Sequence, residues 1–109
     1  MSCEVYLFRR EYVSYDAETD TDLVKQQKFW CASSWKLGIS FAETLGIAEG
    51  CWKSVTSDEF LHVSQQMIAD GEDDCGEYPD GALKAVVDDL EELDQETKRK
   101  SHWFVTLDY

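Results

Sequence analysis

The most constraining feature of this sequence is the uneven distribution of its charge. The chain of 109 residues carries 23 acidic and 10 basic side chains, a formal net charge of −13 at pH 7. Residues 70–96 hold twelve acids and one base, Lys84, whereas the other 82 residues hold eleven acids and nine bases. Carboxylates are almost never fully buried without a partner. A fold of this chain therefore has to keep the acids of residues 70–96 in water.

Residues 81–97 still predict a helix, because their apolar side chains recur at helical spacing. These side chains are Leu83, Val86, Val87, Leu90 and Leu93. Asp88, Glu92 and Glu96 are spaced four residues apart and are predicted to line the opposite face. Six acids between residues 88 and 96 would span about 12 Å of helix axis, or about one charge per 2 Å. That density is close to the roughly 1.7 Å per charge of duplex DNA, although the six do not all share one face.

The segment before this helix predicts an acidic loop from Gly71 to Gly81. Residues 78–81 have the composition of a turn, and Asp80 is placed to cap the helix that follows. The loop adds its charge at or beside the acidic face of the helix. The candidate partner-binding residues are Glu72, Asp73, Asp74, Glu77, Tyr78, Asp88, Glu92 and Glu96.

A second helix is predicted over residues 56–70, where the start signal is strongest. Thr56 and Glu59 have the spacing of a capping box, in which each side chain accepts a hydrogen bond from the other residue's backbone N–H. The predicted buried stripe consists of Phe60, Val63 and Met67. Gly71 is expected to end this helix.

Residues 22–36 also favour a helix, although their apolar side chains are only loosely periodic. Gly38 is expected to interrupt it, and a short helix that opens near Ser40 is expected to stop at Gly46. Trp30 and Trp35 are interpreted as core residues, because their large area dominates packing in a small domain. The alternative is that they line a ligand pocket.

The two ends of the chain predict strands. Residues 4–8 and 102–107 are rich in aromatic and β-branched side chains. Residues 12–15 either continue the first strand or begin a second. The predicted fold is therefore one α+β domain spanning residues 1–109. It comprises a small antiparallel sheet formed by the N- and C-terminal strands, packed by about three helices near residues 22–36, 56–70 and 81–97.

No metal site or cofactor is predicted. Zinc ligands are usually two to four residues apart, but no such pair occurs among the cysteines, which are Cys3, Cys31, Cys51 and Cys75. His62 and His102 are isolated in sequence as well. Acids occupy every second position from residue 16 to residue 22, as they do in a calcium-binding loop. However, the sixth position is Thr21, not glycine, and the twelfth is Gln27, not glutamate.

Several functional classes are disfavoured. The sequence contains no glycine-rich phosphate loop, no G-x-S-x-G and no H-E-x-x-H, so no catalytic residue is predicted and the protein is not expected to be an enzyme. No apolar run approaches the roughly 18 residues of a membrane span, and the N-terminus lacks the pattern of a signal peptide. A cytoplasmic location is therefore expected. The net charge argues against direct binding to nucleic acid or to an anionic membrane.

A basic protein surface is the partner that this charge favours. The leading hypothesis is an inhibitor or nucleic-acid-mimicking decoy that occupies the cationic surface of a nucleic-acid-handling protein, as phage counter-defence proteins do. The first alternative is an immunity protein or antitoxin that neutralises one toxin through an aromatic anchor such as Tyr78. The second alternative is a small accessory domain whose acidity serves only solubility.

Overall fold

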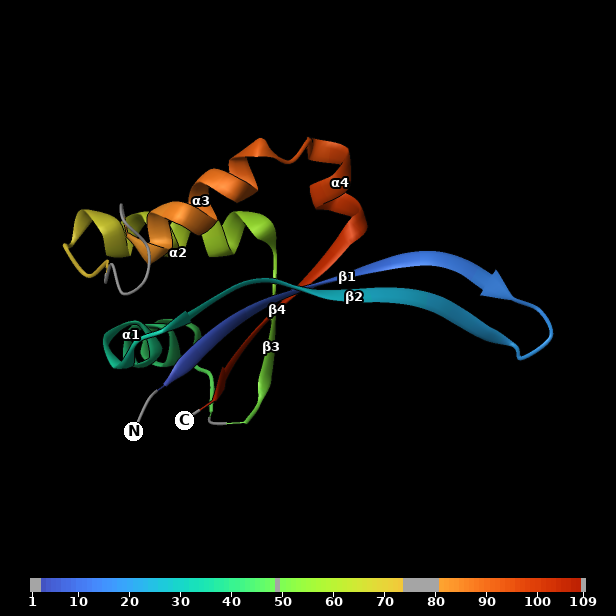
Figure 1. The fold of residues 1–109 in the computed structure, drawn as a ribbon, viewed down its shortest axis with the longest axis horizontal. Helices are drawn as coiled ribbons and strands as arrows, with labels where there is room; N and C mark the ends of the chain where they lie inside the picture. Colours follow the sequence, from blue (N-terminus) through green and yellow to red (C-terminus); the bar gives the residue numbers. More distant parts are fainter. Residues whose placement is uncertain (1–2, 49, 74–80, 109) are drawn as a thin grey trace.

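The computed structural model describes residues 3–48, 50–73 and 81–108. It confirms the predicted α+β class, because the described residues form one antiparallel sheet together with helices (Figure 1). The elements are β1 (Glu4–Asp16), β2 (Thr21–Ser33), α1 (Trp35–Leu45), β3 (Trp52–Val55), α2 (Ser57–Ala69), α3 (Ala82–Glu92), α4 (Gln95–Lys100) and β4 (Ser101–Asp108).

The strands form an antiparallel sheet in the order β2-β1-β4-β3. The first and last strands of the chain are neighbours, paired from Glu4 opposite Asp108 to Glu11 opposite Ser101. The start of β1 and the end of β4 accordingly lie side by side in Figure 1. Residues 12–15 continue β1 and do not begin a second strand.

The helix predicted over residues 22–36 is wrong, because residues 21–33 form β2. Lysine and glutamine favour helices only weakly, and the long pairing of β2 with β1 overrides that preference. β3 was not predicted at all.

A bulge in β2 explains why its strand pattern is hard to read from the sequence. Two consecutive residues of β1 pair with Trp30 and Lys28, so Phe29 is an extra residue between them. Trp30 is buried, and the ring of Phe29 contacts that of the buried Trp103 at 5.1 Å between centroids. Two adjacent side chains therefore face the core, which interrupts the alternation expected of a strand.

Helix α1 begins earlier than predicted. Ser34 is its N-cap, and the backbone N–H of Leu37 donates to the Ser34 hydroxyl at 3.2 Å. Gly38, expected to interrupt a helix, lies inside α1 and is buried against Cys3 of the chain before β1. The predicted stop at Gly46 is confirmed, since Gly46 is the C-cap in a left-handed conformation.

The predicted helix over residues 56–70 is confirmed as α2, including its capping box and its buried stripe. The helix predicted over residues 81–97 is divided into α3 and α4. Leu93 adopts an extended backbone conformation, and Asp94 then caps α4. The predicted apolar stripe of α3 is buried at Leu83, Val86, Val87 and Leu90.

The core lies between one face of the sheet and helices α1, α2 and α3. On the sheet side, Leu7, Trp30 and Val105 are among its buried members. Phe41 of α1 and Phe60 of α2 stack at 5.4 Å between ring centroids and an angle of 8°. Both rings also contact Trp30. The helices therefore cover the same sheet face, and the predicted core position of Trp30 is confirmed, whereas Trp35 is 38% exposed.

The hairpin of β1 and β2 extends past the rest of the sheet (Figure 1). Pairing of β1 with β4 stops at Glu11, so residues 12–24 form a two-stranded arm. This hairpin arm contributes to an elongated shape of 50 × 30 × 23 Å. None of the helices in the described residues has the length and apolarity needed to cross a membrane.

Candidate functional site

The outer face of α3 carries four of the acids of residues 70–96. Asp88, Asp89, Glu91 and Glu92 are all exposed, because the opposite side of the helix is buried. Asp88 pairs with Lys84 at 2.9 Å, and Glu91 accepts a long hydrogen bond from Gln65 at 3.5 Å. The carboxylates of Asp89 and Glu92 form no hydrogen bond or ion pair with the described residues. We call these four acids the α3 acidic face.

Other acids of the same segment stabilise the fold. Asp73 accepts from the backbone N–H groups of Leu83 and Lys84, at 2.9 and 3.3 Å. These are two of the orphan donors at the start of α3, whose N-cap Gly81 has no side chain to offer. A Cβ at Gly81 would lie 2.1 Å from an Asp73 carboxylate oxygen, so the glycine admits the carboxylate. Asp73 thus takes the capping role predicted for Asp80, which lies outside the described residues.

Replacing Asp73 with alanine is expected to lower the free energy of unfolding by about 1 kcal/mol, the usual effect of losing an N-terminal cap. Asp89→Ala is the matched control, because Asp89 caps nothing, and its stability should stay within about 0.5 kcal/mol of the parent. Urea denaturation of both variants measures the difference. Equal midpoints would contradict a capping role for Asp73.

Asp94 is a second structural acid. The backbone N–H of Thr97 donates to it at 2.6 Å, and this hydrogen bond lowers the pKa of the Asp94 carboxyl. Glu96, predicted to extend the row of Asp88 and Glu92, lies on the separate helix α4 and pairs with Lys100 at 2.8 Å. The expectation that these three acids share one helix is therefore wrong.

Of the other predicted partner-binding residues, only Glu72 lies within the described part of the chain. Glu72 is half-buried beside Asp73. Asp74, Glu77 and Tyr78 lie outside the described residues.

Sequence reasoning missed Asp89 and Glu91 as site residues because it considered only the acids spaced four residues apart. The signal that could have found them is the run of four acids in five residues.

The sheet face opposite the helices carries a cluster of aromatic side chains. Tyr6, Phe8, Trp52 and Phe104 lie on β1, β3 and β4 at positions that alternate with core residues. Their ring centroids are 5.8 Å apart for Tyr6 and Phe8, 4.6 Å for Phe8 and Trp52, and 6.2 Å for Trp52 and Phe104. Trp52 is 47% exposed. No helix in the described part of the chain packs on these rings, which we call the aromatic face.

Basic side chains border the aromatic face. The guanidinium carbon of Arg10 lies 4.7 Å from the ring centroid of Phe104, and Lys28 Nζ lies 5.9 Å from that of Tyr6. The Tyr6 hydroxyl donates to Glu4, and this hydrogen bond, together with burial, raises the pKa of Tyr6 to about 12. The phenol therefore remains neutral at physiological pH.

The bases of the molecule are unevenly distributed among its helices and strands. Five of the ten bases lie on the strands, and three more lie on α4. Helices α1, α2 and α3 hold Lys36 and Lys84. The strands also carry five acids, so the sheet side of the molecule is not a basic surface.

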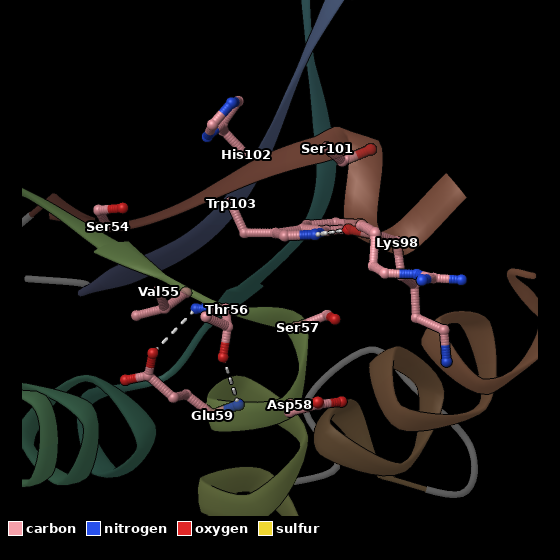
Figure 2. Close-up of a pocket in the computed structure, with 11 residues that line it drawn as sticks. Ser54, Val55, Thr56, Ser57, Asp58, Glu59, Lys98, Ser101, His102 and Trp103 are labelled. Carbon is pink, nitrogen blue, oxygen red and sulfur yellow. Dashed lines mark hydrogen bonds between the residues drawn. The ribbon is translucent and has the colours of Figure 1, made fainter. Parts of the chain in front are cut away.

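A pocket of about 420 Å³ lies where the start of α2 meets the junction of α4 and β4 (Figure 2). Asp58 and Glu59 line one side, and Lys98, Arg99 and His102 line the other. The backbone N–H of Glu59 is already used by the capping box, which leaves this amide unavailable to an anion. The His102 side chain is exposed and makes no hydrogen bond to another described residue. The mixed charges of this pocket indicate no particular ligand.

The thiols are dispersed. Cys3 is buried, Cys31 is half-buried and Cys51 is exposed, and none of these three is bridged to another. Cys75 lies outside the described residues, so the absence of a disulfide in the whole chain stays a prediction. Within the described ranges, no group of three His, Cys, Asp or Glu side chains could hold a metal ion.

Comparison with protein-family models, with curated protein sequences and with solved structures finds no match. The function therefore has to be inferred from the surfaces described above.

Proposed function

We propose that this protein acts by binding a basic protein surface through the α3 acidic face. The observation that supports the proposal most directly is that these acids do little for the fold. The carboxylates of Asp73 and Asp94 cap the starts of helices, whereas those of Asp89 and Glu92 form no hydrogen bond or ion pair with the described residues. Exposed carboxylates on one rigid helix are preorganised for a cationic partner.

The partner proposed is a nucleic-acid-handling protein, for which this chain would be an inhibitor or decoy. Four acids between Asp88 and Glu92 span about 6 Å of helix axis, or roughly one charge per 2 Å or less. Duplex DNA carries one charge per about 1.7 Å, so a groove lined by lysine and arginine would meet a similar charge density. Such pairs associate rapidly because opposite potentials steer the encounter.

The experiment combines capture of the partner from a host lysate with two variants of equal charge. The test variant carries Asp89→Asn, Glu91→Gln and Glu92→Gln. The control variant carries Glu18→Gln, Glu43→Gln and Asp108→Asn, three exposed acids outside α3. Each variant loses three negative charges, so a general effect of net charge would weaken both equally.

The test variant should bind the captured partner about tenfold more weakly than the parent. Each exposed ion pair is worth about 0–1 kcal/mol, and about 1.4 kcal/mol corresponds to a factor of ten. The control variant should bind within about twofold of the parent. Titration by calorimetry gives both affinities. Equal losses in the two variants would contradict a specific role for the α3 acidic face.

A second candidate is supported by the aromatic face. Tryptophan, tyrosine and arginine dominate binding hot spots, and Trp52 and Arg10 lie together on an uncovered surface. This composition fits an immunity protein or antitoxin that neutralises one toxin through an aromatic anchor. In that case Trp52→Ala should weaken binding by at least about 2 kcal/mol while the α3 variant binds normally.

A further inference from the structure

The pocket at the start of α2 has unused hydrogen-bond donors on one wall. The first backbone N–H groups of a helix have no partner inside the helix. In α2, the Thr56 side chain accepts from the N–H of Glu59, and the Thr56 carbonyl accepts from that of Phe60. The N–H groups of Ser57 and Asp58 precede these two, so they have no acceptor within α2. The helix dipole adds a positive potential at the same place.

Lys98 on the other wall of this pocket is a second, independent observation. Lys98 is 9% exposed, and its ammonium group forms no hydrogen bond or ion pair with the described residues. Figure 2 shows Lys98 across the pocket from Ser57 and Asp58. The indole N–H of Trp103 donates to the Lys98 carbonyl at 3.4 Å, which holds this part of α4 against β4. A buried charge without a partner is costly, so the missing partner of Lys98 is expected to be an anion.

The carboxylates that line the pocket do not take that role. Glu59 Oε1 accepts from the backbone N–H of Thr56 at 3.2 Å, which completes the capping box. Asp58 is exposed, and its carboxylate forms no ion pair with Lys98. Solvent screens an exposed charge more strongly than a buried one, so Asp58 offsets the attraction of Lys98 for an anion only in part. Arg99 lines the same pocket and adds a second positive charge.

We propose that this pocket binds a small phosphate-bearing ligand, with the phosphate group between the start of α2 and Lys98. A phosphate group offers three terminal oxygens and about two negative charges, so it can accept from both free N–H groups, the Ser57 hydroxyl and the Lys98 ammonium. A volume of about 420 Å³ is within the range of small-molecule pockets and leaves room for an organic group beside the phosphate. The pocket shares no residue with the α3 acidic face, so its ligand does not depend on the proposed function.

Titration of the isotope-labelled full chain with inorganic phosphate, followed by amide chemical shifts, tests the proposal. Sodium chloride holds the ionic strength constant, so a general salt effect cancels. The amides of Ser57 and Asp58 should shift and saturate with a dissociation constant of about 1 mM, a modest affinity for so small a ligand. Acetate has fewer oxygens and less charge, and should bind at least about fivefold more weakly. The absence of a saturable shift at these two amides overturns the proposal, and so does acetate binding as tight as that of phosphate.

Lys98→Met removes the buried charge but keeps a long apolar side chain. It should weaken phosphate binding about tenfold or more, the usual loss for one charge-assisted hydrogen bond. Lys100→Met is the matched control, because Lys100 lies on the same helix but pairs with Glu96 and does not line the pocket. Its affinity should stay within about twofold of the parent. Far-UV circular dichroism verifies that both variants fold. Equal affinities of the two variants overturn the proposal.

A second pair of variants tests the start of α2 without changing Lys98. Proline is well tolerated at the first position of a helix, where its missing N–H has no intrahelical partner. Ser57→Pro removes the backbone donor and the hydroxyl, whereas Ser57→Ala removes the hydroxyl alone. Ser57→Pro should therefore bind phosphate about fivefold or more weakly than Ser57→Ala. If the two variants bind phosphate equally well, the anion does not lie at this helix start and the proposal is wrong.

Discussion

Replacing Phe60 with alanine is expected to lower the free energy of unfolding by about 3–5 kcal/mol, the usual range for truncating a buried phenylalanine. Phe60 is fully buried and stacks on Phe41, and its ring lies 6.0 Å from that of Trp30. The side chain therefore joins α2 to α1 and to the sheet. Typical domains are stable by about 5–15 kcal/mol, so the variant should retain little stability.

Denaturation by urea, monitored by tryptophan fluorescence, measures this loss. Phe104→Ala is the matched control, because Phe104 is the same residue type but lies half-buried on the aromatic face. Its loss should be smaller, about 1–2 kcal/mol, in proportion to the area that it buries. A loss below about 1 kcal/mol for Phe60→Ala would contradict the packing of α1 and α2 on one sheet face.

Gly38→Ala is expected to destabilise the protein by about 1–3 kcal/mol, although alanine favours a helix over glycine by about 1 kcal/mol. A Cβ at position 38 would lie 2.2 Å from the Cys3 sulfur and 3.2 Å from its Cβ. Cys3 is fully buried, so its side chain has little room to move away. The backbone N–H of Ser34 also donates to the Cys3 carbonyl at 2.8 Å, which holds the two segments together.

A double variant separates this clash from other causes. Cys3→Ala removes the sulfur that the new methyl group would meet. In the Cys3→Ala background, Gly38→Ala should therefore cost at least about 1 kcal/mol less than it does in the parent. Thermal unfolding of the parent, the two single variants and the double variant gives the stabilities that this double-mutant cycle needs. Equal costs in both backgrounds would contradict the close approach of α1 to Cys3.

The helices that could be predicted from the sequence are those marked by residues close together in the chain. The capping box of Thr56 and Glu59 and the apolar stripe of α3 depend on residues within a few positions of one another. Strand β2 could not be predicted, since its exposed arm and the bulge at Phe29 remove the alternation that marks a strand. The break at Leu93 did have a local signal, because Asp94 can cap Thr97.

The candidate site was predicted only in part for a related reason. The sequence shows how many acids residues 70–96 contain, but not which of them the fold uses. Asp73 caps a helix that begins nine residues later, a separation much longer than that of a local cap such as Thr56 and Glu59. The aromatic face could not be assigned either. Successive residues of β1 are apolar on both sides of the sheet, so the sequence does not indicate which side the helices cover.

The most direct test of the central claim is the association rate constant of the captured partner at two ionic strengths. At about 50 mM salt the parent should associate at least tenfold faster than at about 300 mM, because screening shortens the reach of the acidic face. The control variant at Glu18, Glu43 and Asp108 should behave like the parent. The variant at Asp89, Glu91 and Glu92 should associate more slowly and depend less on salt. If all three proteins show the same rates and the same salt dependence, the α3 acidic face is a solvated surface and the proposed function is wrong.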